Sequence, residues 1–324
     1  KQGEGMLNNT ELNGKAKYIE DGTTPASPCH SNPLVSAIIT THNREPDLVL
    51  LAVYSVLNQT YQNIELIVVD DSSPSFDQRA EVEQSVLSIS NDILYMKHEF
   101  CQGACAARNT GLSHAKGTYV GFLDDDDEWV PMKVEEQLKG FHDENTALVY
   151  SQMVYIDEKS HTEFPGKPRS ESGYIFEMLL KRNFIGPTSN PLIKKECLDT
   201  VEGFDVLMES CQDYDLWLRL SLKYPIQYID LSLLRGHIHS GQRISTDDEI
   251  RIKGIEHILS KYADYFNADH EAWYSRGSML IPHYLKVFGR KKALALWISC
   301  VKKCPGKISD NFKLLVMIIS GNEL

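Results

Sequence analysis

Short apolar segments alternate with amphipathic ones along the first half of the chain, and this alternation restricts the possible folds most. We expect buried strands at residues 34–44, 64–75, 93–99 and 118–127, where apolar and β-branched residues cluster. We expect helices between them, at residues 47–59, 78–90 and 103–117. Because the pattern returns roughly every 30 residues, it is typical of βαβ units. The sequence therefore predicts an α/β fold with a mostly parallel sheet flanked by helices.

The rest of the chain divides into three expected regions. Residues 1–32 are polar and rich in Gly, Asn, Thr, Ser and Pro, which predicts a loosely ordered, flexible leader. The α/β domain is expected over residues 33–246; it continues with a helix at 131–142, a strand at 147–156, a helix at 213–222 and an extended segment at 226–240. Residues 247–324 have a mainly helical pattern and form the third region, a C-terminal helical extension.

Charge and cysteine content exclude several classes of protein. A formal net charge of -12 argues against nucleic-acid binding, which usually needs a basic surface. Seven cysteines in 324 residues do not indicate a secreted disulfide scaffold, so a reducing compartment is expected. The first residues lack the apolar core of a signal peptide, and no apolar run is long enough to span a bilayer. Together these features predict a cytoplasmic location.

Acidic residues follow two of the expected strands, as Asp70-Asp71 and as the run from Asp124 to Glu128. Ligands bind beyond the carboxyl ends of strands in open parallel sheets, so these acids are candidate site residues. A dinucleotide-binding G-x-G-x-x-G turn and a P-loop are both absent, and Trp129 replaces the glycine of a calcium-binding EF-hand loop. Two interpretations stay open from the residues alone: a site for a hard divalent cation, or a solvated acidic loop.

Five segments occur in an order and spacing that resemble a known family. They are "VSAIITTHNR", "NIELIVVDDSS", "ARNTGLSHAKGTYVGFLDDDDEW", "GFDVLMESCQDYDLWLRL" and "HIHSGQRIS". Together they resemble a family-2 inverting glycosyltransferase of the GT-A fold, and the resemblance covers about residues 34–245. It implies a catalytic domain over residues 33–246 and transfer of a sugar from a UDP-sugar donor.

The resemblance assigns six residues to the nucleotide, namely Thr40, His42, Asp71, Arg108, Asp124 and Asp125. Thr40 and His42 would contact the uracil and ribose, and Asp71 would accept a hydrogen bond from the uracil ring. Arg108 would lie near the nucleotide or its phosphates, as suits a guanidinium. Asp124 would contact the ribose, or the metal through water, whereas Asp125 occupies the usually small middle position of the family's D-x-D.

The same resemblance implies a divalent cation, Mn²⁺ or Mg²⁺, which would neutralise charge on the leaving diphosphate. Asp126 and His239 would be its ligands, and His239 is preferred over the nearby His237. The last two acids of the run, Asp127 and Glu128, are expected to hold the loop or to cap the following helix.

Asp213 matches the family's catalytic base, which would remove a proton from the acceptor hydroxyl. The residue before it is Gln212 rather than the usual glutamate, so Gln212 is expected to hydrogen-bond the acceptor. Asp215 is the alternative base, or else an acid on the helix surface. A base implies inversion at the anomeric carbon, and the missing Q-x-x-R-W signature indicates transfer of one sugar. Residues 159–190 are expected to form the acceptor site.

Residues 283–313 carry eight Lys/Arg and a single acid, Asp310, among apolar residues. This basic amphipathic pattern predicts contact with an anionic membrane, on its inner face, or packing against the catalytic domain or a second subunit as a homodimer. The expected acceptor is a glycan or lipid-linked glycan of bacterial-type surface polysaccharide synthesis. Two other functions remain as alternatives: a sugar-nucleotide nucleotidyltransferase, and a non-catalytic sugar-nucleotide-binding relative.

Overall fold

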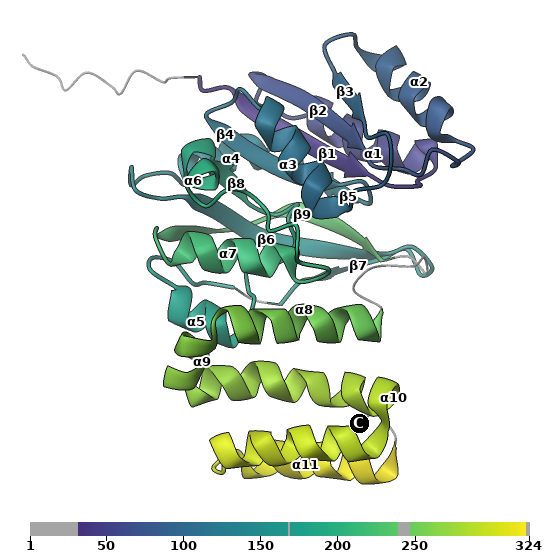
Figure 1. The fold of residues 1–324 in the computed structure, drawn as a ribbon. Coiled ribbons are helices and arrows are strands. Elements are labelled where there is room, and N and C mark those ends of the chain that lie inside the picture. Colours follow the sequence, from purple (N-terminus) through teal and green to yellow (C-terminus); the bar gives the residue numbers. More distant parts are fainter. Residues whose placement is uncertain (1–31, 168, 239–246, 322–324) are drawn as a thin grey trace, which may run out of the picture. The chain divides into compact units, whose positions relative to one another are not determined.

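Strands and helices alternate in the first half of the protein as the sequence predicts (Figure 1). In this computed structural model, the described residues are 32–167, 169–238 and 247–321, and the chain from Pro33 onward forms one compact unit. The first seven elements are β1 (Val35–Thr41), α1 (Pro46–Leu57), β2 (Ile64–Asp70), α2 (Arg79–Ile89), β3 (Leu94–Lys97), α3 (Ala104–His114) and β4 (Tyr119–Asp124). The predicted α/β fold is confirmed.

Shorter elements follow β4 before the chain becomes helical. They are β5 (Asp127–Trp129), α4 (Lys133–Lys139), β6 (Leu148–Asp157), β7 (Thr162–Pro165), α5 (Phe176–Lys181), β8 (Leu192–Lys194), α6 (Lys195–Thr200), α7 (Gln212–Ser221) and β9 (Ile226–Ile238). Four helices complete the described chain: α8 (Asp248–Lys261), α9 (Ala263–Ala268), α10 (His270–Lys303) and α11 (Ile308–Ser320). None of the helices in the described ranges is both long enough and apolar enough to cross a bilayer.

Within the described residues, the strands form one nine-stranded sheet with the order β3-β2-β1-β4-β8-β6-β9-β5, and β7 pairs with β6. Strands β3, β2, β1 and β4 are parallel, and β6 is parallel to β9. Strand β8 enters antiparallel between β4 and β6. Because Thr40 pairs with both Val69 and Asp124, the carboxyl ends of β1, β2 and β4 meet at one edge of the sheet.

The alternation of side chains along each strand supplies both faces of the sheet with a core. In β1, Ile38 packs in the cluster that includes α3, α5 and α7, whereas Ala37 and Ile39 pack in the cluster that includes α1, α2 and α4. Helix α3 lies very close to the sheet, since a methyl group added at Gly111 would meet the Ile38 Cγ2 atom at 2.4 Å. Small residues in α3 thus serve close packing against β1.

The acidic run ends in a strand and not in a helix. Asp127 and Glu128 belong to β5, which pairs antiparallel with β9. Helix α4 begins only at Lys133, and its N-cap Met132 makes no side-chain capping hydrogen bond. The prediction that Asp127 or Glu128 caps this helix is therefore wrong. The physical reason is that the edge of β9 offers β5 a ladder of backbone partners, which the local charge pattern does not reveal.

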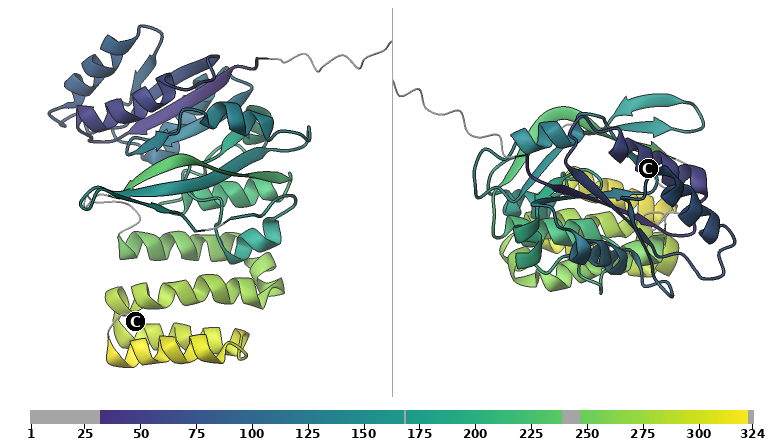
Figure 2. Two further views of the ribbon diagram at one scale, coloured as in Figure 1. Left: turned by 180° about the vertical axis from the view of Figure 1, so that it is seen from behind. Right: turned by 90° about the horizontal axis from the view of Figure 1, so that it is seen from above.

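Helices α8, α10 and α11 lie one after another on the side of α5 and α7 (Figures 1 and 2). Helix α10 contains a sharp break at Gly289, which has φ 76° and ψ 177°. This conformation is essentially restricted to glycine, and it divides α10 into two helical arms. Tyr274, Ile281, Ala293 and Cys300 from the two arms share a small core with Met317 and Ile318 of α11.

Candidate active site

The candidate site begins at the edge where β1, β2 and β4 end. Thr40 is half-buried at the end of β1, Asp71 follows β2, and Asp124 is the last residue of β4. In open α/β sheets, ligands bind beyond these carboxyl ends, especially where neighbouring connections diverge. The structure therefore brings three of the predicted nucleotide-binding positions to one edge.

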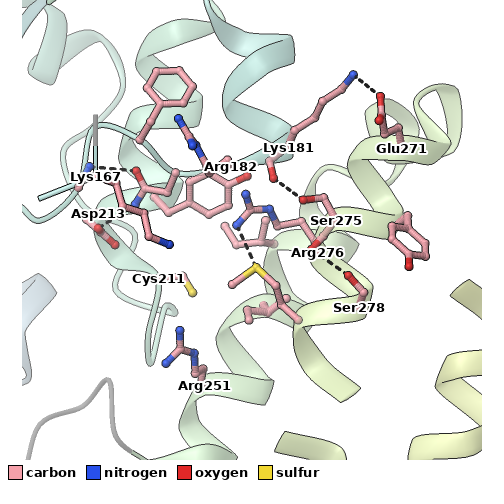
Figure 3. A pocket seen from close by; sticks show the side chains of 18 of the residues that line it. Lys167, Lys181, Arg182, Cys211, Asp213, Arg251, Glu271, Ser275, Arg276 and Ser278 are labelled. Atoms are coloured by element: carbon pink, nitrogen blue, oxygen red, sulfur yellow. Dashed lines mark hydrogen bonds and ion pairs between the residues drawn. The ribbon is translucent and has the colours of Figure 1, made fainter. Parts of the chain in front are cut away.

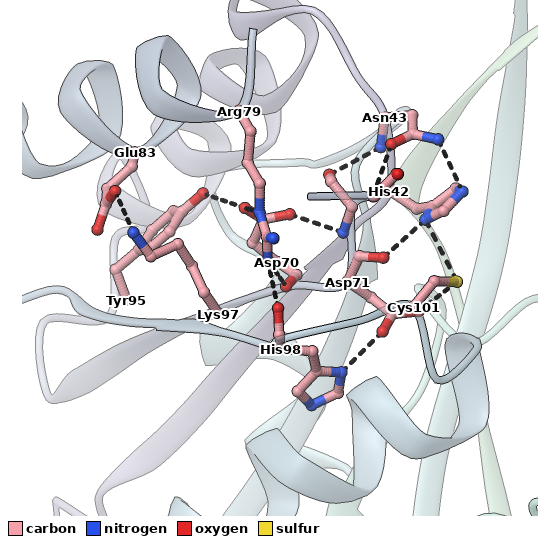
Figure 4. Close-up of polar contacts among 12 residues, drawn as sticks. His42, Asn43, Asp70, Asp71, Arg79, Glu83, Tyr95, Lys97, His98 and Cys101 are labelled. Atoms are coloured by element: carbon pink, nitrogen blue, oxygen red, sulfur yellow. Dashed lines mark hydrogen bonds and ion pairs between the residues drawn. The ribbon is translucent and has the colours of Figure 1, made fainter. Parts of the chain in front are cut away.

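Asp71 is buried and holds the start of α3 in place (Figure 4). Its carboxylate accepts hydrogen bonds from the backbone N–H groups of Gln102, at 2.7 Å, and Gly103, at 2.8 Å. The ring of His98 lies 2.7 Å from the same carboxylate. Burial raises the pKa of Asp71, but these hydrogen bonds outweigh it, so its pKa lies below the usual value. Asp71 is thus an ionised hydrogen-bond acceptor at this edge of the sheet.

His42 is exposed next to Asp71, and its Nδ1 atom lies 2.8 Å from the Asp71 backbone oxygen. In the described part of the chain, His42, Asp71 and Cys101 offer potential metal-ligand atoms that all lie within 4.8 Å of one another. The His42 ring already contacts the backbone oxygen of Asp71, and the Cys101 thiol donates to the Asp71 carboxylate. The same carboxylate also accepts from a backbone N–H group. The three residues thus form one hydrogen-bonded group at this edge, and contact of His42 and Asp71 with a nucleotide stays a prediction.

Arg108 connects the end of β4 with the start of α7. Its guanidinium donates to Asp124 Oδ1 at 2.7 Å and to Gln212 Oε1 at 2.8 Å. The side chain is buried, and it packs over the ring of Phe204 at 5.3 Å. A buried arginine that binds both residues fixes their separation, because its planar donors are rigid. The predicted nucleotide and acceptor residues are thus held together through one guanidinium.

Arg44 determines how the middle of the acidic run is arranged. It donates to Asp125 Oδ1 at 2.9 Å and to Asp126 Oδ2 at 3.3 Å. Asp125 is buried, and burial raises its pKa to about 6 although Arg44 opposes this. Asp126 is more accessible at the same edge. The uncommon charge at Asp125 thus anchors Arg44, and contact of Asp125 with the nucleotide stays a prediction.

The residues at this edge suit a hard cation. Asp126 offers a carboxylate beside the accessible Asp124. Arg44 and Arg108 pair with these two carboxylates, so a cation would compete with them for the oxygens. Oxygen donors of this kind are what Mg²⁺ and Mn²⁺ prefer. The other predicted ligand, His239, lies outside the described residues. The nearby His237 is held by Glu128, at 2.6 Å, and by Glu158.

Asp213 is the second residue of α7 and is half-buried. Asn183 donates to its Oδ2 atom at 3.1 Å. Burial raises the pKa of Asp213 above the usual aspartate value, against the effects of the Tyr214 backbone N–H, Arg108 and Asn183. The charge of Asp124 also acts on it, which shows that the two ends of the site are close. A carboxylate with a raised pKa suits a general base.

Asp215 is neither exposed nor positioned as a base. It is fully buried, and its carboxylate forms ion pairs with Arg219 and Lys261, both at 2.8 Å. Tyr262 donates to it at 3.1 Å. The prediction of an acid on the helix surface is wrong, because α8 and its C-terminal end cover this face of α7. Asp213 is therefore the carboxylate of α7 that remains available to a substrate.

A cavity of about 1000 Å³ opens beside Asp213 (Figure 3). Its lining includes Arg169, Arg182 and Gly186 from the segment 159–190, for which the sequence predicts an acceptor site. It also includes Arg251, Ser275 and Arg276 from the C-terminal helices, which sequence reasoning did not assign to any site.

Three further residues of the site carry no local sequence signal. Arg44 binds the acidic run across about 80 residues, Asn183 binds Asp213 and Thr188 donates to Asp124. Each partner lies far away in the sequence, so only the folded chain brings them together.

Comparison with known proteins decides the class of this site. Residues 36–201 match the family described as "Glycosyl transferase family 2". The glycosyl transferase WcaA of Escherichia coli (strain K12), whose name refers to colanic acid biosynthesis, is 33% identical over 250 residues, covering 73% of this chain and 84% of WcaA. The chain belongs to glycosyl transferase family 2. This family-2 enzyme is therefore a glycosyltransferase, which disfavours the nucleotidyltransferase and the non-catalytic alternatives.

Another relative of this family-2 glycosyltransferase is named in more detail. The UDP-Glc:alpha-D-GlcNAc-diphosphoundecaprenol beta-1,3-glucosyltransferase WfaP of Escherichia coli is 33% identical over 201 residues, covering 59% of this chain and 71% of WfaP.

Solved structures share the fold at low sequence identity. S. aureus TarS 1-349 in complex with UDP-GlcNAc has a TM-score of 0.56 at 17% identity and covers 89% of this chain and 87% of its own. The mannosyltransferase PcManGT from Pyrobaculum calidifontis, in complex with GDP-Man and Mn²⁺, has a TM-score of 0.53 at 17% identity and covers 91% and 77%. The predicted GT-A type architecture is confirmed.

Proposed function

We propose that this enzyme is a metal-dependent inverting glycosyltransferase that moves one sugar from a UDP-sugar to a hydroxyl group of a glycan acceptor. One observation carries the proposal most directly. Arg108 binds Asp124 at the strand edge and Gln212 beside Asp213, so the proposed donor-binding edge and the proposed base would lie on either side of one guanidinium. A transferase needs this pairing, whereas a protein that only binds sugar nucleotides needs no base.

The donor would bind along the edge formed by β1, β2 and β4. Thr40, His42 and Asp71 would contact the uridine, with Asp71 as an ionised hydrogen-bond acceptor. Asp124 would bind the ribose while Arg108 holds its carboxylate in place. The relatives support UDP as the nucleotide, because TarS was solved with UDP-GlcNAc and WfaP is named for UDP-Glc.

Asp126 and His239 would hold a divalent cation, Mn²⁺ or Mg²⁺. When bound, the cation would neutralise negative charge that develops on the diphosphate leaving group. The chain's own contribution is the arrangement of the carboxylates: Arg44 binds the buried Asp125 at 2.9 Å and the more accessible Asp126 at 3.3 Å, and a cation would share the Asp126 carboxylate with Arg44 or displace it. The PcManGT structure, which contains Mn²⁺, supports a metal of this type in the fold.

Asp213 would take the proton from the acceptor hydroxyl as that oxygen attacks the anomeric carbon. Direct attack on the face opposite the leaving group inverts the configuration at this carbon. Asn183 holds one carboxylate oxygen of Asp213, and Gln212 would contact the acceptor. Burial raises the pKa of Asp213, which makes the carboxylate a stronger proton acceptor than an exposed aspartate.

We further propose that the acceptor belongs to bacterial surface polysaccharide synthesis and is linked to a lipid. The names of WcaA and WfaP, which refer to colanic acid and to a diphosphoundecaprenol acceptor, support this proposal. A cytoplasmic enzyme that binds the inner face of the membrane peripherally would meet such an acceptor. Exposed apolar residues of α11 would contact the anionic membrane, and the same helices would offer the surface of a homodimer.

The test is a screen of UDP-sugars with the purified enzyme, with manganese, with magnesium and with a chelator. We expect release of UDP from at least one UDP-sugar, with the rate restored by manganese after chelation. NMR of the product should show inverted configuration at the transferred anomeric carbon. Retained configuration, or an equal rate in chelator, would contradict the proposal. Asp126→Asn should lose the response to metal, and the surface variant Asp143→Asn is the matched control.

A further inference from the structure

The cavity beside Asp213 has an excess of positive charge in a protein that is acidic as a whole. Seven lysine and arginine side chains line it, against three acidic ones. The formal net charge of the chain is -12. One of the three acids is the proposed base, so few carboxylates remain to neutralise the cations. Such a local excess of one sign favours a ligand of the opposite charge.

Arg276, on the first arm of α10, lines the cavity, and none of its partners in the described chain is a carboxylate. Its side chain is only 6% exposed, and its Nε atom donates to the backbone oxygen of Leu180 at 3.1 Å. Within the described residues, its Nη2 atom has no hydrogen-bond partner. The guanidinium packs over the ring of Tyr214, at 4.9 Å from its centroid. A buried guanidinium with a free donor is costly unless a ligand completes it.

Two other arginines, Arg169 and Arg182, also line the cavity. The charge of Arg182 acts on both Arg169 and Arg276 and lowers the pKa of each, after the larger effect of burial. Arg169 donates to the backbone oxygens of Ser151 and Ile185, and none of its described partners is a carboxylate. Arg182 is itself paired with Glu171 at 3.2 Å, whereas neither Arg169 nor Arg276 has a carboxylate among its partners in the described chain. An anion beside these two guanidinium groups would compensate their charge.

Two lysines of the cavity, in contrast, are already compensated. Lys181 binds Glu271 at 3.0 Å (Figure 3). Lys307 binds the same carboxylate group at 2.9 Å. The ion pairs join α5, α10 and the start of α11. The cavity thus has a rim, where Lys181 and Lys307 pair with Glu271, and an arginine-lined interior. The interior lies on the side of Asp213.

We propose that the arginine-lined interior binds the diphosphate group of a lipid-linked acceptor. This inference rests on the proposed function, because Asp213 lies in the same cavity and would activate the hydroxyl of the same molecule. Guanidinium groups bind phosphate oxygens through paired, charge-assisted hydrogen bonds, and the free donor of Arg276 offers one of them. The diphosphate would therefore position the acceptor sugar beside the base.

The surroundings of the cavity favour a lipid over a water-soluble phosphate. Lys307 lines the cavity, and the residues that follow it in α11 carry exposed apolar side chains. Ile308 is 75% exposed and Phe312 is 66% exposed. An apolar chain attached to a diphosphate in the cavity would find an apolar surface beside it. This arrangement suits a polyprenyl chain or the membrane that contains it.

The test is calorimetric titration of the full chain with farnesyl diphosphate in the presence of a chelator. The wild-type protein should bind it, and excess UDP should not displace it. Arg276→Gln should weaken binding at least about tenfold, as loss of a charge-assisted hydrogen bond predicts. Lys292→Gln, which removes an exposed charge from the second arm of α10, is the matched control and should bind as the wild type does.

Three results would overturn the inference: no binding by the wild type, displacement by UDP, or equal binding by Arg276→Gln. Inorganic pyrophosphate should bind more weakly than farnesyl diphosphate, and equal affinity would contradict the lipid assignment. If Arg276→Gln does not fold, Arg182→Gln gives the same test, because the Arg182 side chain is 56% exposed. UDP release from UDP-sugars is measured separately, so failure of the proposed function remains distinguishable from failure of this inference.

Discussion

Asn183 is one of three neighbours, with the Tyr214 backbone N–H and Arg108, that favour the ionised form of the proposed base Asp213. Burial raises the pKa of Asp213, and the hydrogen bond from Asn183 to its carboxylate counteracts part of that rise. Since a base must be ionised, activity should fall as the pH drops through this pKa. The apparent pKa on the acid side of the pH profile of kcat/KM should therefore lie above the ordinary aspartate pKa of about 3.9.

Replacing Asn183 tests this balance. Asn183→Ala removes a hydrogen bond to the charged form, so the pKa of Asp213 should rise and the acid limb should move to higher pH. The measurement is a pH profile of kcat/KM for transfer. The control is Asn267→Ala, at an exposed asparagine of α9, which should keep the wild-type profile. A limb that stays in place or moves to lower pH in Asn183→Ala would contradict the assignment.

For individual residues, the sequence predicts which residues belong to the site better than it predicts which residues they contact. The structure brings Asp71, Asp124 and Arg108 to one edge, because they lie in motifs next to strand ends. The nucleotide contacts that the family resemblance assigns to them stay predictions. The structure shows Asp215 in a buried cluster because Lys261 and Tyr262, more than 40 residues away, fold over it. The anchoring of Asp125 by Arg44 is likewise a long-range contact.

At the scale of elements, the break at Gly289 decides the path of the C-terminal helices. A methyl group added at Gly289 would meet no atom within 4 Å, so the conformation and not the space requires glycine. Its φ of 76° with ψ of 177° lies in a region that other residues rarely adopt. The sequence pattern indicates helices over residues 247–324, but this break carries no distinctive signal there.

We expect Gly289→Ala to lower the free energy of unfolding by about 1–3 kcal/mol, because the new residue must adopt this strained conformation. Denaturant-induced unfolding measures the effect. Gly306→Ala is the matched control, since Gly306 also has no atom near the added methyl group and does not have a positive φ. The account of the break is wrong if the two variants have equal stability, or if Gly306→Ala is the less stable one.

For the molecule as a whole, the C-terminal helices have two separate surfaces. One surface contributes Ser275, Arg276 and Lys307 to the cavity beside the base. The other presents exposed apolar side chains of α11, among them Ile308, Phe312 and Ile319. The sequence predicts two alternatives for this region, packing against the catalytic domain or contact with a membrane. Packing is observed: α10 contacts α5, and α8 and α10 share a small core. Membrane contact stays a prediction.

The double variant Ile308→Ser and Phe312→Ser tests that contact. Burial of each apolar side chain in a bilayer contributes roughly 1.5–3 kcal/mol at most, so the variant should bind anionic vesicles at least about tenfold more weakly. Sedimentation with vesicles that contain phosphatidylglycerol measures this. Val206→Ser with Leu207→Ser removes two equally exposed apolar residues far from α11 in the sequence and should leave binding unchanged. Equal losses in both variants would contradict a specific membrane face.

We propose above all that Asp213 acts as the base, while the UDP-sugar binds separately, along the edge formed by β1, β2 and β4. The most direct measurement compares UDP binding and sugar transfer in the wild type and in Asp213→Asn. We predict unchanged affinity for UDP in the presence of manganese, with transfer reduced by at least about 100-fold, because the amide accepts no proton. Unchanged transfer in Asp213→Asn, at intact UDP affinity, would contradict the claim.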